Sequence, residues 1–231
     1  MIHAFGDSFV VGDQDDYIND KNTDPESAPT HNMSEATRTE YLKYNVSFAA
    51  LIAKQLDTKL KNHAVRGTGN FPQLDLLFDQ LNNKEITSND VVLFGITTGI
   101  RDRAGLLDYN NLHKSLSVLH LGNWAEIDAI PKTDQFYVLS ILSQLSLMFN
   151  VRIIKFNLFT RALDYKFDDY LTGTLVDILN DTYAQGITHP YHDQLKIPAG
   201  YQELYTYKKH PSIAGHKKIA RWFLDNIKFN E

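Results

Sequence analysis

The stretch DVVLFGI, residues 90–96, decides the fold class, because an unbroken apolar run follows Asp90 and ends at the polar pair Thr97-Thr98. A strand with one face in water alternates apolar and polar residues, whereas a continuous apolar run is typical of a strand buried on both faces. Such strands belong to parallel sheets with helices packed on either side. We therefore predict that residues 90–96 form a buried strand of a parallel sheet.

Strands and helices alternate along nearly the whole chain. Short apolar runs predict further strands at 2–5, 60–65 and 151–159. Apolar residues at helical spacing predict helices at 48–56, 74–81, 138–149 and 212–227, and a weaker helix near 171–181. Residues 97–132 are mixed in character and remain unassigned. An alternation of this kind calls for a parallel sheet that is covered by helices on both faces.

The 231 residues suit one domain with a sizeable core, since 43% of them are hydrophobic and neither an internal repeat nor a linker interrupts them. Residues 11–42 are polar and irregular, with the acidic stretch DQDDYINDKNTDPES at their centre. A charge-rich stretch is most often a solvated surface loop, but long loops in compact domains also serve as lids over a site. We expect a single domain, 1–231, with 11–42 as a lid or a surface loop.

The composition argues against several classes of function. The formal net charge of −5 disfavours nucleic-acid binding, which needs a basic face to contact phosphates. No stretch approaches the roughly 20 apolar residues of a membrane span, and we expect no signal peptide. The chain contains 0 cysteines, so disulfides, zinc–thiolate sites and cysteine nucleophiles are excluded. We expect a cytoplasmic or virion-associated protein that binds neither nucleic acid nor membranes.

Three loops that follow predicted strands carry small or polar residues. They read Gly-Asp-Ser-Phe at 6–9, Asn-His-Ala-Val-Arg-Gly-Thr-Gly-Asn at 62–70, and Gly-Ile-Thr-Thr-Gly-Ile-Arg at 95–101. The carboxyl ends of parallel strands lie side by side, and ligands bind at this edge of open α/β sheets. The three loops are therefore expected to converge on one site.

Ser8 in the first loop is a candidate nucleophile, although a serine at a strand end can also be a turn residue. A serine hydroxyl becomes a good nucleophile when a base takes its proton, and that base is most often histidine. Among the nine histidines, His210 has a distinctive setting, because Pro211 stiffens the chain after it and Ser212 is a suitable N-cap for the last helix. A histidine held just before a helix can project over the edge of a sheet.

Four blocks of the sequence resemble the SGNH, or GDSL-type, hydrolases. They are GDSF at 6–9, the loop at 62–70 with its Gly-x-Gly-Asn ending, the apolar strand that ends around Gly95, and HPSIAGHKKIA at 210–220. Their order and spacing match the family over almost the full chain. The resemblance implies a three-layer α/β/α, flavodoxin-like fold with a mostly parallel sheet of about five strands. It also implies hydrolysis of carboxylic esters, commonly acetyl or acyl esters of carbohydrates or lipids, without a cofactor.

The resemblance assigns roles to three residues. Ser8 matches the nucleophile and His210 matches the base. Gly67 matches the glycine of the second block, whose backbone N–H forms the oxyanion hole together with the N–H of Ser8. A glycine suits this role because its bare backbone can approach the developing oxyanion closely.

Two positions depart from the family pattern, and the first concerns the oxyanion hole. The third block usually reads Gly-x-Asn-Asp, and its asparagine donates to the oxyanion, but here Thr97 stands at that position. The Thr97 hydroxyl has a shorter reach, and Asn70 in the neighbouring loop is an alternative third donor. The loss of one such donor typically costs about 3 kcal/mol of transition-state stabilisation.

The second departure is Tyr207, which stands three residues before His210, where the family usually has the aspartate of a catalytic triad. That acid orients the histidine and can be worth about 10⁴ in turnover. Asp193 and Glu203 lie upstream and are candidates to replace it from another loop, and a backbone carbonyl could hold the ring instead. The sequence does not choose among these three.

The Gly-x-Thr-Thr variant with a nearby arginine is similar to a divergent branch of the family found in phage and environmental sequences. Arg101 could hold an anionic group of a substrate through its planar fork, or it could lie at the surface paired with Asp102. His189 and His192 have a spacing that can bind a metal on a helix, but Pro190 between them favours a turn, so no metal site is expected.

These residues predict a serine esterase that acts on a small-molecule or carbohydrate ester. An O-acetyl carbohydrate is the preferred substrate class, since the acidic loop and the aromatic residues suit a polar partner better than a lipid. The two missing polar side chains support a second hypothesis, a catalytically impaired domain that binds carbohydrate or has a structural role in a virus particle. A nucleotide-binding protein of flavodoxin-like fold is disfavoured, because no glycine-rich loop has phosphate-binding spacing.

Overall fold

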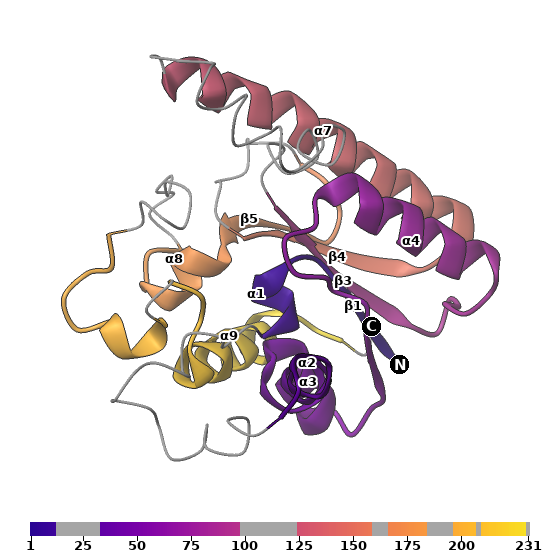
Figure 1. Ribbon diagram of the computed structural model, residues 1–231. Helices are drawn as coiled ribbons and strands as arrows, with labels where there is room; N and C mark the ends of the chain where they lie inside the picture. Colours follow the sequence, from indigo (N-terminus) through magenta and orange to yellow (C-terminus); the bar gives the residue numbers. More distant parts are fainter. Residues whose placement is uncertain (13–32, 98–123, 159–165, 184–195, 207–208, 230–231) are drawn as a thin grey trace.

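The computed structural model of the protein describes residues 1–12, 33–97, 124–158, 166–183, 196–206 and 209–229, with the backbone alone for 124–134. Within these residues, five strands form one sheet in which all neighbours pair in parallel (Figure 1). Their order, β2-β1-β3-β4-β5, is the flavodoxin-like order. The strands are β1 (Ile2–Phe5), β2 (Leu60–Asn62), β3 (Val91–Ile96), β4 (Arg152–Asn157) and β5 (Tyr170–Thr174).

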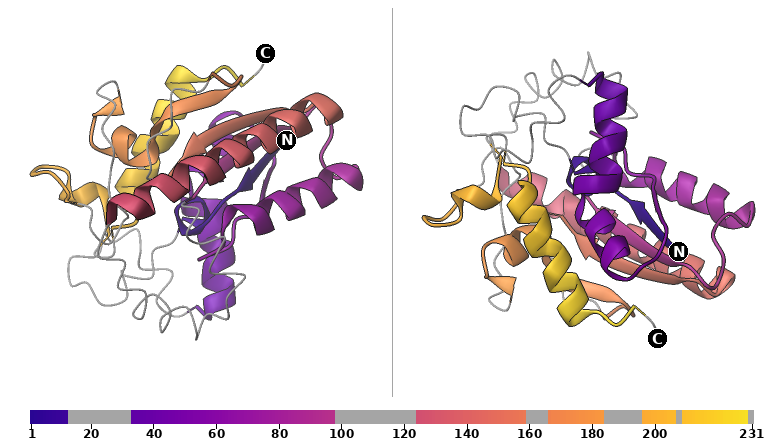
Figure 2. Two further views of the ribbon diagram at one scale, coloured as in Figure 1. Left: turned by 90° about the horizontal axis from the view of Figure 1, so that it is seen from above. Right: turned by 90° about the horizontal axis from the view of Figure 1, so that it is seen from below.

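Helices cover both faces of the sheet, so the fold has three layers (Figure 2). One face carries α3 (Phe48–Gln55), α8 (Leu175–Leu179) and α9 (Ile213–Asn226). The other face carries α4 (Asn70–Asn82) and α7 (Trp124–Phe149). The short helix α1 (Ser8–Val11) joins the first of these layers directly after β1. The predicted three-layer α/β/α fold with a parallel sheet of about five strands is therefore confirmed.

The position of β3 in the middle of the sheet explains why its sequence is apolar throughout. Val92 and Phe94 face α4 and α7, whereas Leu93 faces the layer of α3 and α9, and all three side chains are fully buried. A polar side chain at any of these positions would lose its hydration without gaining a partner. The strand therefore requires apolar residues on both sides, as its sequence predicts.

The segment predicted to be irregular, 11–42, contains a helix, so the prediction is wrong for residues 35–42. There α2 (Glu35–Tyr41) leads into the π-helix η3 (Leu42–Val46). Ser34 caps α2 by accepting a hydrogen bond from the N–H of Thr37, and none of the α2 residues is buried. A helix that buries no side chain needs no apolar period from which it could be recognised. Residues 13–32, the rest of the expected lid or loop, lie outside the described residues.

The weak helix predicted near 171–181 is confirmed only for α8 and is wrong for the start of the segment, which belongs to the edge strand β5. Tyr170 to Thr174 pair with β4, with an irregularity in register between Phe156 and Asn157. Thr174 then caps α8 and forms a capping box with Asp177. A strand of five residues that leads directly into a helix of five is too short for its period to be recognised.

Two other predicted elements are confirmed with different ends. β2 stops at Asn62, whose Oδ1 accepts the N–H of Ala64 at 3.1 Å and so starts a turn. α7 begins at Trp124, inside the stretch that the sequence left unassigned, and has 26 residues. Of the helices in the described ranges, none combines the length and the apolar content that a membrane crossing requires.

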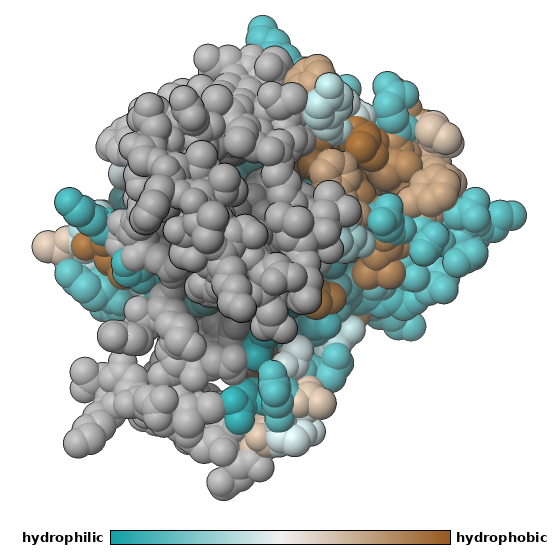
Figure 3. Space-filling view, turned by 45° about the horizontal axis from the view of Figure 1, so that its top comes forward, coloured by the Kyte–Doolittle hydropathy of each residue, from teal (hydrophilic) through white to brown (hydrophobic). Residues whose placement is uncertain are grey.

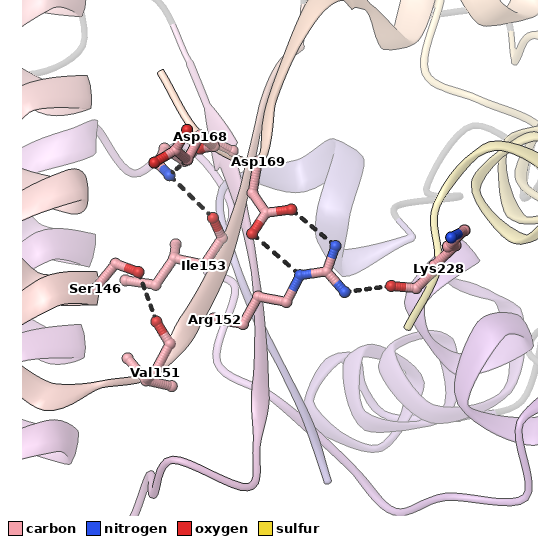
Figure 4. Close-up of polar contacts among 8 residues, drawn as sticks. Ser146, Val151, Arg152, Ile153, Asp168, Asp169 and Lys228 are labelled. Carbon is pink, nitrogen blue, oxygen red and sulfur yellow. Dashed lines mark hydrogen bonds and ion pairs between the residues drawn. The ribbon is translucent and has the colours of Figure 1, made fainter. Parts of the chain in front are cut away.

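Polar contacts anchor β4 at the edge of the sheet opposite to the carboxyl ends of the strands (Figure 4). The guanidinium of Arg152 donates to both carboxylate oxygens of Asp169, with Nε to Oδ2 at 3.0 Å and Nη2 to Oδ1 at 2.8 Å. It also donates to the backbone carbonyl of Lys228, which follows α9. A forked arginine–carboxylate pair has a defined geometry. The contacts therefore tie the start of β4, the turn before β5 and the end of the chain together.

Candidate active site

The candidate residues converge at the point where the strand order of the sheet reverses. β1 lies between β2 and β3, so the chain crosses to one side after β1 and to the other side after β2. In open α/β sheets, the crevice outside the carboxyl ends of the strands at such a point is the ligand-binding position. Ser8 follows β1 and Thr97 follows β3 on these two paired strands. The topology therefore brings the first and third predicted loops side by side.

Ser8 is the first residue of α1, and Asp7 is the N-cap of this helix. A carboxylate oxygen of Asp7 accepts the N–H of Phe9 at 2.9 Å, as side chains at helix starts commonly do. Ser8 is 5% exposed, and its Oγ lies 2.9 Å from Nε2 of His210. This is a hydrogen-bond distance between a hydroxyl and an imidazole. The structure therefore brings together the two residues predicted as nucleophile and base.

His210 is held by a tight loop that closes on Thr206. The N–H of His210 donates to Oγ1 of Thr206 at 3.1 Å, and the N–H of Thr206 donates to the carbonyl of His210 at 2.8 Å. Tyr205 and Pro211 pair as an isolated antiparallel bridge on either side of this loop. The His210 ring packs against Phe9, with ring centroids 5.1 Å apart. These contacts fix both the backbone and the ring of His210.

The start of α9 packs closely on η6 (Gln202–Leu204), the short 3₁₀ helix that precedes the His210 loop. Ser212, the N-cap of α9, accepts the N–H of Gly215 at 3.1 Å and donates to the carbonyl of Glu203 at 2.6 Å. A Cβ atom on Gly215 would lie 2.3 Å from the carbonyl oxygen of Leu204. Only a glycine fits there, so the glycine of the HPSIAG block allows the close packing that places His210.

Asp7, Asn70 and Thr97 form a buried hydrogen-bonded network that joins the three loops. Oγ1 of Thr97 donates to the second carboxylate oxygen of Asp7 at 3.0 Å. The side chain of Asn70 holds the backbone of Thr97 in both directions, because Oδ1 accepts the Thr97 N–H at 2.9 Å and Nδ2 donates to the Thr97 carbonyl at 3.1 Å. The two predicted third donors therefore contact each other, and the Thr97 hydroxyl proton is directed to Asp7.

Two backbone N–H groups near this network, those of Ser8 and Gly67, have no acceptor in the part of the chain that the structure describes. The N–H of a first helix residue has no partner within its own helix. Gly67 has a φ of +69°, and no described atom lies within 4 Å of the place where its Cβ would be. The N–H of Val65 donates to the carbonyl of Gly6 at 3.0 Å and so ties the Gly67 turn to the first loop. Within the described ranges, both N–H groups therefore lack a hydrogen-bond acceptor.

Gln73 is a residue of this region that the sequence analysis did not single out. It lies on α4, is 3% exposed, and its Oε1 accepts the N–H of Gly6 at 3.0 Å. The bond holds the residue before Asp7 from the face of the sheet opposite to α1. Helical spacing in the sequence could have indicated that Gln73 is buried, because Gln73 precedes Leu77 by four residues on the buried side of α4.

His216, six residues beyond His210, has a different role from the predicted base. Its ring is fully buried in α9, and its Nδ1 accepts the N–H of Phe48 at the start of α3 at 3.2 Å. Burial, with the charge of His210 as a smaller cause, lowers the pKa of His216 to about 3. A neutral His216 therefore links α9 to α3 at neutral pH.

Of the remaining predicted site residues, only Glu203 lies within the described ranges. Glu203 exposes its side chain on η6, and its carbonyl accepts from Ser212. Asp193, Tyr207 and Arg101 lie outside the described residues, as do the two histidines of the HPYHD stretch, and their roles stay predictions. Across the described ranges, no three or more His, Asp and Glu side chains are grouped so that they could hold a metal ion.

A surface groove of about 580 Å³ lies away from this site, between α3 and α9. Its lining includes Lys54 and Arg221 but neither Ser8 nor His210. The reactive groups meet at the edge of the sheet, whereas the groove lies between two helices of the outer layer. The groove is therefore not part of the candidate active site.

The site contains the parts that acyl transfer requires. A serine hydroxyl lies within hydrogen-bond distance of an imidazole, and two backbone N–H groups without described acceptors come from loops at the same edge of the sheet. A nucleophile, a base and donors for a developing negative charge are the three components of a hydrolytic serine site.

No protein-family model matches the chain, and no curated protein matches it significantly. A member of the lipolytic G-D-S-L family from Veillonella parvula has a TM-score of 0.38 and 12% identity, over 98% of this chain and 97% of that chain. A second similar structure is a carbohydrate esterase whose active site displays divergent catalytic and non-catalytic binding functions. It has a TM-score of 0.46 and 15% identity, over 100% of this chain and 68% of that chain. LAE5, an alpha/beta hydrolase enzyme from the metagenome of Lake Arreo, has a TM-score of 0.40 and 15% identity, over 97% of this chain and 93% of that chain. At these identities, the likenesses concern the fold alone.

Proposed function

We propose that the protein is a serine esterase of the SGNH type that hydrolyses carboxylic esters. The observation that carries the proposal is the 2.9 Å contact between Oγ of Ser8 and Nε2 of His210 at the carboxyl edge of the sheet. A serine hydroxyl becomes nucleophilic when an imidazole within reach can take its proton. The four sequence blocks that resemble the SGNH family support the same assignment.

In the proposed reaction, Oγ of Ser8 attacks the ester carbonyl while Nε2 of His210 takes the hydroxyl proton. The tetrahedral intermediate then loses the alcohol, which receives this proton from His210, and Ser8 is left acylated. Water attacks the acyl group as His210 takes a proton from it, and the carboxylic acid leaves with Ser8 protonated again. These steps balance without a cofactor.

The negative charge of the tetrahedral intermediate needs hydrogen-bond donors. We assign the N–H groups of Ser8 and Gly67, neither of which has an acceptor in the described ranges. For a third donor we favour Asn70 over Thr97, because the Thr97 hydroxyl already donates to Asp7. A donor of this kind is worth about 3 kcal/mol in the transition state.

A further group must orient the outer ring nitrogen of His210, and its three candidates are Asp193, Glu203 and a backbone carbonyl. Glu203 is disfavoured, because its side chain is exposed and water screens an exposed carboxylate strongly. Asp193 or a backbone carbonyl then remains. Either group would hold the imidazole in the tautomer that accepts the serine proton.

The substrate class that we propose is an O-acetyl ester of a carbohydrate. The chain has an acidic stretch at 13–27 and contains 13 Phe and 12 Tyr residues. Aromatic rings with polar tips and hydrophilic loops suit a polar ligand better than a long lipid chain. A catalytically impaired domain that binds the same sugars would share these features, and turnover separates the two functions.

Hydrolysis of p-nitrophenyl acetate tests the proposal. We expect turnover above background for the wild type, and background rates for Ser8→Ala and for His210→Gln. Ser88→Ala is the matched control, since Ser88 is exposed just before β3 at the opposite edge of the sheet. Acetate release from an acetylated xylo-oligosaccharide should exceed hydrolysis of a long-chain p-nitrophenyl ester. Equal rates for wild type and Ser8→Ala would overturn the esterase proposal.

A further inference from the structure

The outer surface of α4 and α7 has an exposed apolar face that the proposed reaction does not use (Figure 3). This apolar face consists of the exposed large side chains of the two helices, Phe71, Phe78, Phe136, Tyr137, Ile141, Leu147 and Met148. The rings of Phe78 and Phe149 are in edge-to-face contact, with centroids 6.3 Å apart, so the surface continues from one helix to the other. A contiguous exposed apolar surface is typical of an interaction site.

The composition of α7 from Gln135 to Phe149 is unusual for a helix with an exposed outer side. No residue from Gln135 to Phe149, the part whose side chains are described, is charged. A helix on a protein surface normally carries charged residues toward the solvent, and one that is apolar all round is normally buried. In the isolated chain, however, Leu147 is 75% exposed and Met148 is 70% exposed.

The outer side of α7 also has a regular spacing. Its exposed residues include Tyr137, Ile141, Gln144 and Met148, which follow one another at intervals of four, three and four. This alternation of three and four is the spacing of residues at a seam between two packed helices. The residues of α7 that pack on the sheet, Val138 among them, are different ones. These four residues, which we call the α7 row, therefore lie on a different side of the helix from the residues that pack in the core.

We propose that the apolar face binds a second copy of the chain, with the two α7 helices packed antiparallel across a two-fold axis. Intervals of four, three and four read the same in both directions, so an antiparallel copy presents the same row in register. Tyr137 then meets the partner's Met148, an aromatic–sulfur contact, and Ile141 meets the partner's Gln144. Each residue of the row finds its counterpart on the other copy, as a two-fold interface requires.

Charge favours a second copy over a membrane surface as the occupant. Identical surfaces can meet where they do not repel each other, and the α7 residues from Gln135 to Phe149 carry no charge, although the whole chain carries −5. A bilayer with anionic lipids attracts apolar faces that are bordered by Lys and Arg. α4 contains Asp75 and Asp79 but no basic residue. α4 and the α7 residues from Gln135 to Phe149 therefore lack the basic residues that would hold them on an anionic membrane.

Sedimentation velocity over a range of protein concentrations tests the proposal. We expect the wild type to form a dimer of twice the 26.4 kDa chain mass, at low and at high salt, because screening weakens ion pairs and not apolar contacts. Met148→Glu should weaken the dimer by at least about tenfold in dissociation constant. Gln55→Glu, exposed on α3 in the opposite layer, adds the same charge and should leave the dimer intact.

Crosslinking gives a second measurement that needs no destabilising variant. The chain contains 0 cysteines, so one introduced cysteine reports a contact without background. A short bis-maleimide should join two copies of Gln144→Cys and should not join two copies of Gln55→Cys. A wild type that is monomeric at all concentrations, a dimer unchanged by Met148→Glu, or a monomer that floats with lipid vesicles would each overturn the proposal. None of these measurements depends on esterase activity.

Discussion

The hydroxyl of Ser8 and the imidazole of His210 lie 2.9 Å apart, although 202 positions of the chain separate them. Ser8 opens the helix after β1, and His210 lies in the loop before α9. Asp7 caps the helix that carries Ser8, and Thr206 closes the loop that carries His210. The contact between the two reactive groups therefore depends on residues that do not themselves react.

Thr206→Val removes the oxygen that accepts the His210 N–H at 3.1 Å and keeps the shape of the side chain. The loop then loses a bond that closes it, and the imidazole shifts relative to Ser8. A misplacement of about 1 Å can cost about a hundredfold, so we expect kcat for p-nitrophenyl acetate to fall about 10- to 100-fold with KM nearly unchanged. Thr206→Ser keeps the hydroxyl and should retain wild-type kcat. Equal losses in both variants would argue against this positioning role.

Thr97→Val distinguishes between two roles for the Thr97 hydroxyl, a structural bond to Asp7 and a donor to the oxyanion. Asp7 is fully buried and accepts from this hydroxyl, so the variant removes one donor from a buried carboxylate. A hydrogen bond to a charged group contributes about 1.5–3 kcal/mol, and we expect the free energy of unfolding in urea to fall by about this amount. Turnover should change by less than about tenfold. A fall in kcat of about 10²- to 10³-fold at unchanged stability would instead make the hydroxyl an oxyanion donor.

Asn70→Asp tests the residue that holds the Thr97 backbone. The variant replaces the Nδ2 donor by an oxygen that faces the Thr97 carbonyl, so we expect a loss of about 1–3 kcal/mol of stability. If Nδ2 is also the third oxyanion donor, kcat falls by about 10²- to 10³-fold. Asn82→Asp makes the same change at the exposed end of α4 and should affect neither quantity. Wild-type kcat in Asn70→Asp would exclude Asn70 from the oxyanion hole.

The buried histidines predict that the fold weakens in mild acid. Burial is the main cause that lowers the pKa of His216 to about 3 and that of His3 to about 4. In an unfolded chain, a histidine has a pKa near 6.5. From about pH 6.5 down to these lower pKa values, the unfolded chain binds more protons than the folded one. The free energy of unfolding therefore falls with pH, by up to about 1.4 kcal/mol per pH unit for each such group.

Urea unfolding at several pH values between about 7 and 4 measures this loss. His216→Asn keeps an acceptor near the position of Nδ1 for the Phe48 N–H but cannot titrate, so its stability should depend less steeply on pH. The same slope in the variant and the wild type would contradict the assignment of His216, and a stability that is constant over this range would contradict the pKa values of both histidines.

The central strands could be predicted because burial on both faces demands apolar residues at every position, as β3 shows. The edge strand β5 pairs with β4 alone, and Thr172 within it is exposed, so its sequence is mixed and fits a weak helix equally well. α2 has no buried residue, which leaves no apolar period to identify it. Elements that bury little surface were therefore the ones that the sequence could not specify.

Within the site, Ser8 and His210 could be singled out because their side-chain chemistry and motif spacing mark them. Gln73 and Thr206 could not be assigned a role, because their oxygens accept from the backbone N–H groups of Gly6 and His210. Which backbone group a side chain reaches depends on how distant segments pack, and no local pattern encodes it. For the same reason, the side-chain contacts within the Asp7–Thr97–Asn70 network could not be predicted from the sequence.

Labelling with a fluorophosphonate tests the central claim most directly, because this probe reacts with a serine whose hydroxyl is activated by a neighbouring base. We predict that the wild type is labelled on Ser8, as located by mass spectrometry of its peptides, and that Ser88→Ala is labelled equally. Ser8→Ala and His210→Gln should remain unlabelled. A wild-type protein that takes up no probe, or takes it up on another residue while Ser8 stays unmodified, would contradict the account.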